Sequence, residues 1–384
     1  MSGPATARLR RLWLNIHLWL GLGLALLLVP IGLTGSLLVW HDHVDVLINP
    51  ARYATTSGPA AAPSTLLASA TRALGGLQPV ALRMPEGVGW PATVTARESR
   101  GANAGGRPRF MTVYLDPPTA KVLDVVETRS TLINFLHRFH ENLTVPEYNG
   151  RSIVGWVGVA MLILSLSGIY LWWPRNAGFV KGLRWTRGPR LSLNLHHMLG
   201  FWISIPLAVV SFTGIYLGFP QQGRDLLSSV APMSQRSGGG FNQQLARQTS
   251  LNIDAAVAAA VAAEPGRTPA AIFFPPQQNP AWRIQMRAGG SDDLSTVMVD
   301  DRSGAASKVT PLSGDRIALW IRWVHEGSNA GMLWRVLVFL CGVFPTIFAV
   351  TGFFIWLRRR EGRNVTQGLK GVPQLDAASE TAYR

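Results

Sequence analysis

Four long apolar runs divide the chain into segments that can cross a membrane and segments that cannot. They extend over residues 12–40, 153–173, 191–219 and 332–357. Each has the roughly 20 residues that a helix needs to cross a hydrocarbon core of about 30 Å, so we predict four transmembrane helices. A cleaved signal peptide is the alternative for the first run, but its apolar core would be about 7–15 residues long with a small-residue cleavage site. This run is longer and ends at Trp40, which favours a retained helix.

The polar stretches between these runs have the pattern of small α+β domains. Short apolar segments separated by Gly and Pro predict strands at residues 80–84, 92–96, 110–115, 121–126, 271–274, 282–286 and 294–299. Longer segments of helical composition or periodicity lie at residues 64–73, 132–142, 253–263 and 317–325.

The second half of the chain repeats the first. His17, Gly21 and Thr34-Gly35 return at the same spacing as His196, Gly200 and Thr213-Gly214. His140-Glu141 followed by Ser167-Gly168 returns as His325-Glu326 followed by Thr351-Gly352. The soluble parts also match, because Val113-Tyr-Leu-Asp116 corresponds to Val297-Met-Val-Asp300. We predict two halves of one orientation, related by an axis along the membrane normal as in parallel transporter repeats.

These patterns predict an α+β integral membrane protein in which each half contributes two spans and one α+β domain. The predicted segments are an N-terminal tail with the first span (1–43), the first domain (44–130), a pre-membrane helix with the second span (131–174), a loop (175–190), the third span (191–220), the second domain (221–315), a pre-membrane helix with the fourth span (316–357) and a tail (358–384).

Composition and charge agree with a membrane protein. The chain is 47% hydrophobic and only 15% charged, whereas soluble domains have about 25% charged residues. The net charge of +15 comes without a nucleic-acid recognition motif, and its basic residues crowd the ends of the apolar runs. Short basic loops stay on the cytoplasmic side, which predicts cytoplasmic termini and two domains outside. The single cysteine, Cys341, excludes an internal disulfide.

The histidines are the candidate functional residues. Imidazole in or against a bilayer is costly and usually functional, although any single one can be an ordinary interfacial residue. Four of the eight occupy matched positions: His17 with His196 at the cytoplasmic ends of spans one and three, and His140 with His325 on the outer side of spans two and four. The repeat therefore predicts two sites of two histidines, one in each leaflet.

Two imidazoles on one axis favour haem as the ligand. Zinc or copper sites usually recruit further ligands, whereas axial haem ligation needs two trans nitrogens and a slot for the macrocycle. Gly21 and Gly200 lie one turn after the ligand candidates, although small residues also serve helix packing. The Thr-Gly pairs of spans one and three lie about 27 Å along the helix from His17 and His196, near the depth of the outer histidines. The Ser-Gly and Thr-Gly pairs of spans two and four lie near the inner ones.

The other histidines are assigned no role. His197 is adjacent to His196 but should point about 100° away from it on a helix. His137 shares a helix face with His140, and we prefer His140 because its following glutamate is also matched. His41 and His43 have no counterpart in the other half and are expected at the outer interface.

Three motifs resemble the PepSY-associated transmembrane family over nearly the whole chain: Val113-Tyr-Leu-Asp116-Pro, Leu136-His137-Arg-Phe-His140 and Leu171-Trp172-Trp173-Pro174. The length and double layout resemble the siderophore-iron reductases of that family. The resemblance implies PepSY-like outer domains and an inner-membrane protein with two b-type haems on His17, His196, His140 and His325. Its substrate would be a ferrioxamine-like ferrisiderophore, reduced on the periplasmic side with electrons from a cytoplasmic donor or a quinol. A non-redox scaffold or regulator and a siderophore transporter remain the alternatives, and no motif indicates a catalytic side chain.

Overall fold

The computed structural model describes residues 4–98, 108–174, 183, 190–234, 244–246, 248–289 and 293–370. The chain forms two compact units. The helical unit comprises Met1–Ser36, Pro146–Phe219 and His325–Arg384, and the sheet unit comprises Leu37–Val145 and Pro220–Val324. Most of the predicted loop 175–190 lies outside the described residues.

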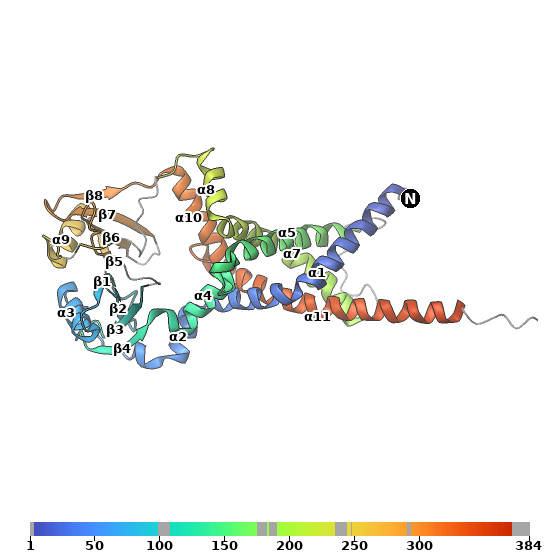
Figure 1. The fold of residues 1–384 in the computed structure, drawn as a ribbon, viewed down its shortest axis with the longest axis horizontal. Helices are drawn as coiled ribbons and strands as arrows, with labels where there is room; N and C mark the ends of the chain where they lie inside the picture. Colours follow the sequence, from blue (N-terminus) through green and yellow to red (C-terminus); the bar gives the residue numbers. More distant parts are fainter. Residues whose placement is uncertain are drawn as a thin grey trace, which may run out of the picture. The chain divides into compact units, whose positions relative to one another are not determined.

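The helical unit is built from four long helices (Figure 1): α1 (Pro4–Val39), α5 (Gly150–Trp172), α7 (Leu191–Gly218) and α11 (Gly331–Lys370). All four contain segments long and apolar enough to cross a membrane, and they coincide with the four apolar runs of the sequence. Their outward side chains are apolar as well: Trp19 and Trp202 are each 62% exposed. Large apolar side chains in such positions suit contact with lipid rather than water.

Glycines let these helices approach closely. α1 meets α11 where a Cβ added at Gly32 would lie 2.6 Å from the carbonyl oxygen of Gly342, and Ser36 Oγ donates a hydrogen bond of 2.7 Å to Phe339 O nearby. α5 meets α7 where a Cβ at Gly218 would lie 2.7 Å from Gly155 Cα. Backbones pack this tightly in membrane helices only where small residues leave room.

The sheet unit contains a single antiparallel sheet with the strand order β4-β3-β2-β1-β5-β6-β7-β8. Its strands are β1 (Gln78–Arg83), β2 (Ala92–Arg97), β3 (Phe110–Leu115), β4 (Val122–Glu127), β5 (Arg267–Phe273), β6 (Ala281–Ala288), β7 (Leu294–Asp300) and β8 (Ala306–Val309). The strands predicted for two domains thus join along β1 and β5, where Leu82 pairs with Ile272. Seven strands lie where the apolar pattern predicts them.

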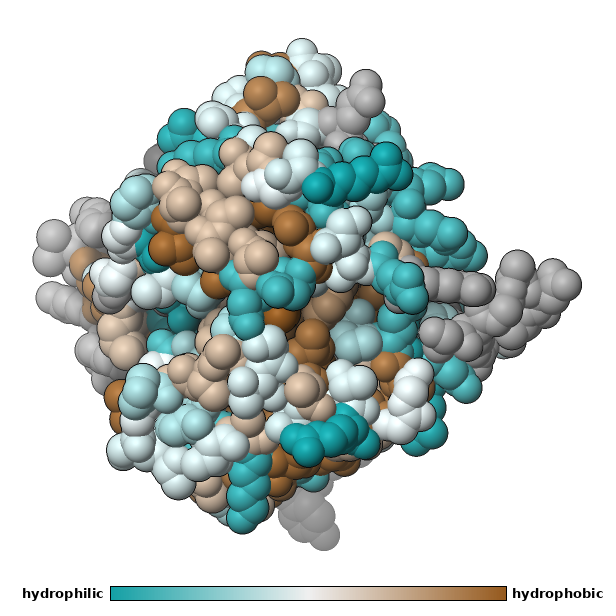
Figure 2. Space-filling view, turned by 90° about the vertical axis from the view of Figure 1, so that its left-hand side faces the viewer, coloured by the Kyte–Doolittle hydropathy of each residue, from teal (hydrophilic) through white to brown (hydrophobic). Residues whose placement is uncertain are grey.

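One face of the sheet holds the core of this unit. A row of directly paired residues crosses it, in which Val113, Val94, Leu82, Ile272, Ile284 and Val297 are fully buried. Helices α3 (Pro63–Leu74) and α9 (Ile253–Ala263) cover this face and complete the core. Figure 2, turned to show the side on which α3 and α9 lie in Figure 1, shows hydrophilic residues interspersed with apolar ones.

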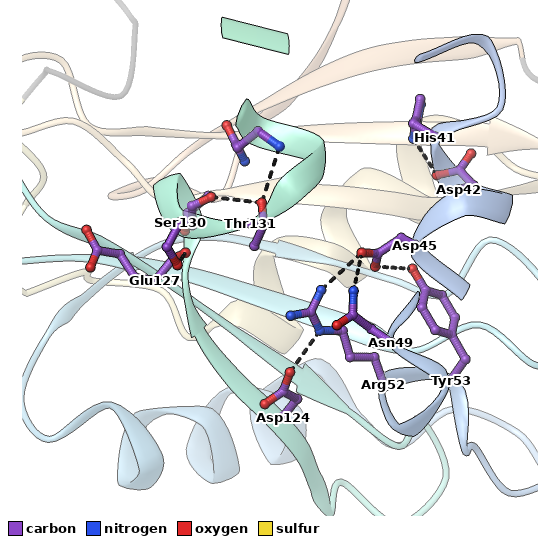
Figure 3. A network of polar contacts seen from close by, with 12 residues as sticks. His41, Asp42, Asp45, Asn49, Arg52, Tyr53, Asp124, Glu127, Ser130 and Thr131 are labelled. Carbon is purple, nitrogen blue, oxygen red and sulfur yellow. Dashed lines mark hydrogen bonds and ion pairs between the residues drawn. The ribbon is translucent and has the colours of Figure 1, made fainter. Parts of the chain in front are cut away.

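Shorter helices flank the long ones in sequence: α2 (His41–Ile48), η1 (Pro50–Tyr53), η2 (Thr128–Ser130), α4 (Leu132–Asn142), η3 (Pro146–Tyr148), α8 (Pro220–Ser228) and α10 (Ser313–Glu326). A polar network fixes α2 and η1 to β4 (Figure 3). Arg52, only 6% exposed, donates to Asp124 at 2.8 Å and to Asp45 at 3.1 Å. The Tyr53 hydroxyl donates to Asp45 at 2.7 Å. Burial, and then the Asp45 carboxylate, raise the pKa of Tyr53.

Buried aspartates hold the segments that precede α3 and α9. Asp116 accepts the backbone N–H of Thr56 at 2.7 Å. Asp301 accepts the backbone N–H of Ser250 and the indole N–H of Trp282, each at 2.7 Å. The sequence matches Asp116 with Asp300, and both do begin turns with the same backbone hydrogen bonds. The buried carboxylate of the second half, however, belongs to the next residue.

Candidate functional site

The four long helices enclose a cavity of about 270 Å³. The residues of α1 that line it recur every three or four positions from Arg10 to Leu28, which places them on one helix face. Apolar side chains make up most of the wall. The histidines and glycines in it are His17 and Gly21 of α1, Gly168 of α5, His196, His197 and Gly200 of α7, and Gly352 of α11.

His17 and His196 face each other in this cavity. Their ring centres are 6.3 Å apart and their planes are inclined by 81°. In a five-membered ring with bonds of about 1.33 Å each nitrogen lies about 1.1 Å from the centre, and a metal–imidazole bond is about 2.0–2.1 Å. Two imidazoles bound trans to one metal therefore have centres about 6.2–6.4 Å apart. The observed separation fits that value.

Hydroxyl groups on α5 and α11 determine which nitrogen of each ring is available. Nδ1 of His17 lies 2.8 Å from Ser167 Oγ, and Nδ1 of His196 lies 2.9 Å from Thr351 Oγ1. Each hydroxyl donates its own proton to a backbone carbonyl, Ser167 to Leu164 at 3.2 Å and Thr351 to Ile347 at 2.7 Å. A hydroxyl that donates to its carbonyl accepts from Nδ1, which then carries the proton. This tautomer leaves Nε2 of both rings with a lone pair for a metal.

The glycines next to these hydroxyls lie beside the two rings. A Cβ at Gly168 would lie 3.6 Å from His17 Cε1, and one at Gly352 would lie 3.7 Å from His196 Cε1. Both distances are ordinary van der Waals contacts, so each glycine lies directly beside an imidazole ring. Nothing lies within 4 Å of a Cβ added at Gly200, so this glycine borders open space. The predicted proximity of Ser167-Gly168 to His17 and of Thr351-Gly352 to His196 is confirmed.

His325 has a similar environment at the other end of α7. Its Nδ1 lies 3.0 Å from the carbonyl oxygen of Val210 and 3.3 Å from Thr213 Oγ1. Because a carbonyl can only accept, Nδ1 carries the proton and Nε2 has the lone pair. A Cβ at Gly214 would lie 2.9 Å from His325 Cε1. The Thr213-Gly214 pair therefore contacts His325 as the sequence predicts.

The remaining histidines occupy several environments. His140 lies half-buried on α4 in the sheet unit, and its pairing with His325 stays a prediction. His137, also on α4, lies 6.0 Å from His41 between ring centres, and His43 contacts Trp40. His197 lines the cavity beside His196, which the expected 100° divergence did not anticipate. Adjacent residues of a helix can both border a cavity that is broad enough.

Sequence reasoning missed one wall of the cavity. Trp172, 3% exposed, stacks on Phe201 with ring centres 3.8 Å apart and planes 22° from parallel. Trp172 ends an apolar run and Phe201 follows Gly200, so only the helix pairing reveals their contact. Among the described residues no group of three or more His, Cys, Asp or Glu side chains gathers around a possible metal position. The two-histidine arrangement is thus the candidate site.

Four apolar helices around a histidine-lined cavity, joined in sequence to a polar sheet unit, define a multi-pass membrane protein. The family model of the PepSY-associated TM region matches residues 14–359. The chain therefore belongs to the PepSY-associated transmembrane family. Comparison with curated proteins found no match.

Proposed function

We propose that the protein is an inner-membrane dihaem electron-transfer protein that reduces the Fe(III) of a ferrisiderophore to Fe(II) on the periplasmic side. The observation that carries the proposal is the His17–His196 pair, with ring centres 6.3 Å apart and each Nδ1 within hydrogen-bond distance of a hydroxyl. This donor set suits axial haem ligation, which needs two trans nitrogens and no third protein ligand.

His17 and His196 would hold the inner haem, and His140 and His325 the outer one. Haem ligated by two histidines supplies one-electron redox chemistry with no open coordination position. Ser167 and Thr351 fix the inner rings by accepting their Nδ1–H groups, an arrangement that orients imidazole ligands and raises their basicity. Apolar side chains around such a site control solvent access and lower the dielectric constant.

Matched contacts in the two halves support a duplication. A Cβ at Gly342 of α11 would approach the carbonyl of Gly32 on α1, and one at Gly158 of α5 would lie 3.8 Å from the carbonyl of Ser211 on α7. In the sheet, Ala81 pairs with Phe273 and Arg83 with Ala271 on either side of the Leu82–Ile272 pair. Such a register suits a local two-fold axis. We infer two halves of the same orientation, each contributing two spans.

The charges support a placement in the membrane. Arginines at positions 8, 10, 11, 358, 359 and 360 and the basic loop 175–190 suit the cytoplasmic side under the positive-inside rule. The sheet unit would then be periplasmic and PepSY-like. A negative-inside potential assists outward electron movement by about 2.3 kcal/mol per charge per 100 mV across the full span.

Reduction explains iron release. One electron from a cytoplasmic donor or a quinol, which is oxidised, converts siderophore-bound Fe(III) to Fe(II). Siderophores bind iron through oxygen donors, which suit the harder Fe(III) better than the softer Fe(II). The reduced metal is therefore held more weakly and leaves the chelate.

A visible spectrum of the purified chain tests the proposal. We expect Soret and α bands that shift on addition of dithionite, and loss of one haem in the double variant His17→Ala with His196→Ala. His43→Ala, whose ring contacts Trp40, is the control and should keep both haems. A folded but colourless protein would overturn the proposal and favour a scaffold. Unchanged bands in the double variant would show that the inner ligands are wrongly assigned.

A further inference from the structure

The face of the sheet opposite α3 and α9 carries arginines near its centre. Residues that pair directly across antiparallel strands lie on the same face. Arg83 pairs with Thr93 on one side and Ala271 on the other, and Ala271 pairs with Gln285. The neighbouring row of paired residues on the same face joins Phe273 to Arg283. None of these residues belongs to the core on the α3 and α9 side. Arg83 is on a central strand, β1, and Arg283 lies two strands away on β6.

The two arginines are exposed and close enough to repel each other. Both side chains are solvent-exposed. Burial, and then the positive charge of Arg83, lower the pKa of Arg283. The Arg283 guanidinium lies 4.0 Å from the centre of the Phe273 ring, a cation–π contact that orients it. Two cations on one face of the sheet create a positive potential that attracts anions.

The acidic groups nearby already have partners. Glu86 pairs with Arg287 at 3.7 Å, and Asp124 pairs with Arg52 at 2.8 Å. In the part of the chain that the structure describes, no acidic side chain forms an ion pair with Arg83 or Arg283. The centre of this face therefore has uncompensated positive charge next to an aromatic ring and the polar side chains of Thr93 and Gln285.

We propose that Arg83, Arg283 and Phe273 form a binding site for a ferric chelate of net negative charge. The proposal rests on the proposed reduction of ferrisiderophores and narrows their class. Guanidinium groups bind carboxylate-type oxygens through paired hydrogen bonds, and an aromatic ring offers a flat surface to catechol groups.

Formal charge separates the siderophore classes. Three doubly charged catecholates leave the Fe(III) chelate with a charge of minus three. Three singly charged hydroxamates neutralise Fe(III), so a ferrioxamine-like chelate with a protonated amine has a charge of plus one. Like charges repel, and the arginine pair therefore disfavours the ferrioxamine class that the family resemblance implies and favours catecholate or carboxylate chelates.

Binding of redox-inert gallium(III) chelates to the full-length protein in nanodiscs tests the site, with calorimetry as the readout. The gallium complex of a hexadentate tris-catecholate should bind at least tenfold more tightly than that of an ammonium-bearing trihydroxamate. Arg83→Gln with Arg283→Gln should weaken catecholate binding at least tenfold. The control, Arg72→Gln with Arg302→Gln, removes the same charge from exposed positions outside this face and should change affinity less than threefold.

Several outcomes would overturn the inference. The inference fails if the two chelates bind with equal affinity. It also fails if the Arg83 and Arg283 changes leave the affinity unchanged, or if the control variant loses as much affinity. Full displacement by inorganic phosphate would assign the face to small anions in general. Thermal unfolding of each variant checks that it is folded, and Arg83→Lys with Arg283→Lys should retain part of the affinity. Failed chelate binding with intact haem bands refutes this inference alone, whereas chelate binding by a colourless protein refutes only the haem proposal.

Discussion

Thr351→Val tests how the His196 ring is held. Valine has nearly the shape of threonine but cannot accept the 2.9 Å hydrogen bond from His196 Nδ1. The change leaves a part-buried N–H without an acceptor, at a cost of about 1–3 kcal/mol. Loss of such a supporting contact typically weakens metal binding about 10–100-fold, equivalent to about 1.4–2.8 kcal/mol. The two figures agree, so, if His196 holds a haem as proposed, we expect haem retention at that site to fall by one to two orders of magnitude.

The assay measures the rate at which haem leaves the purified variant for an excess of apomyoglobin, together with the midpoint potential of each haem. Only the inner site should lose haem faster and change potential. Ser167→Ala should have a smaller effect, because the hydroxyl of Ser167 is held to its carbonyl at 3.2 Å and that of Thr351 at 2.7 Å.

Thr346→Val provides the matched control on the same helix. The hydroxyl of Thr346 is buried without a hydrogen-bond partner, so its removal should leave haem retention unchanged. Equal haem loss in the Thr346 and Thr351 variants would point to a general weakening of α11. Wild-type retention and potential in both the Thr351 and Ser167 variants would refute the role of the hydroxyls.

Three further changes test the packing and the sheet. Gly32→Ala places a Cβ 2.6 Å from the carbonyl oxygen of Gly342 and should destabilise the protein by about 1–3 kcal/mol; a thermal melt in detergent measures this, with Gly23→Ala, which meets nothing within 4 Å, as the control. Asp301→Ala leaves the buried indole N–H of Trp282 and the part-buried N–H of Ser250 without their acceptor and should cost about 2–4 kcal/mol, measured by urea unfolding. Burial raises the pKa of Asp116, but the hydrogen bonds that its carboxylate accepts lower it by more, so the pKa lies below its usual value. The ionised carboxylate therefore stabilises the fold above the usual pKa of about 3.9. This stabilisation is lost as the pH falls through the lowered value. Asp116→Asn should show a flatter dependence of the urea midpoint on pH in this acidic range, and an unchanged dependence would contradict the assignment.

The sequence predicted the elements well because hydrophobic periodicity acts locally. The helix at residues 253–263 and the four spans follow from runs that bury one face or enter lipid. The strand β8 (Ala306–Val309) was missed because its residues are half-buried or exposed and it is held by pairing with β7. The helices α2 and α8 were missed because they have only 8 and 9 residues, too few for a clear helical period.

The proximity of His17 and His196 was predictable because a repeat carries long-range information. The matched positions of His17 and His196 indicated two side chains that meet, and the Ser-Gly and Thr-Gly pairs indicated their neighbours. The stacking of Trp172 on Phe201 has no such signature, since Trp172 returns as Trp356 but Phe201 corresponds to Leu22 in the other half. The pairing of β1 with β5 was likewise invisible, because each strand has the same pattern whether its neighbour comes from its own half or from the other.

The continuous sheet has a consequence for biosynthesis. Strand β1 is an internal strand in the finished protein, but its partner β5 is made only after two further membrane helices. Until residues 267–273 emerge, the N-terminal half presents a bare backbone edge, which can pair with another chain. Premature termination after the third helix would leave that edge permanently open, so truncated chains should associate or be degraded rather than persist as stable monomers.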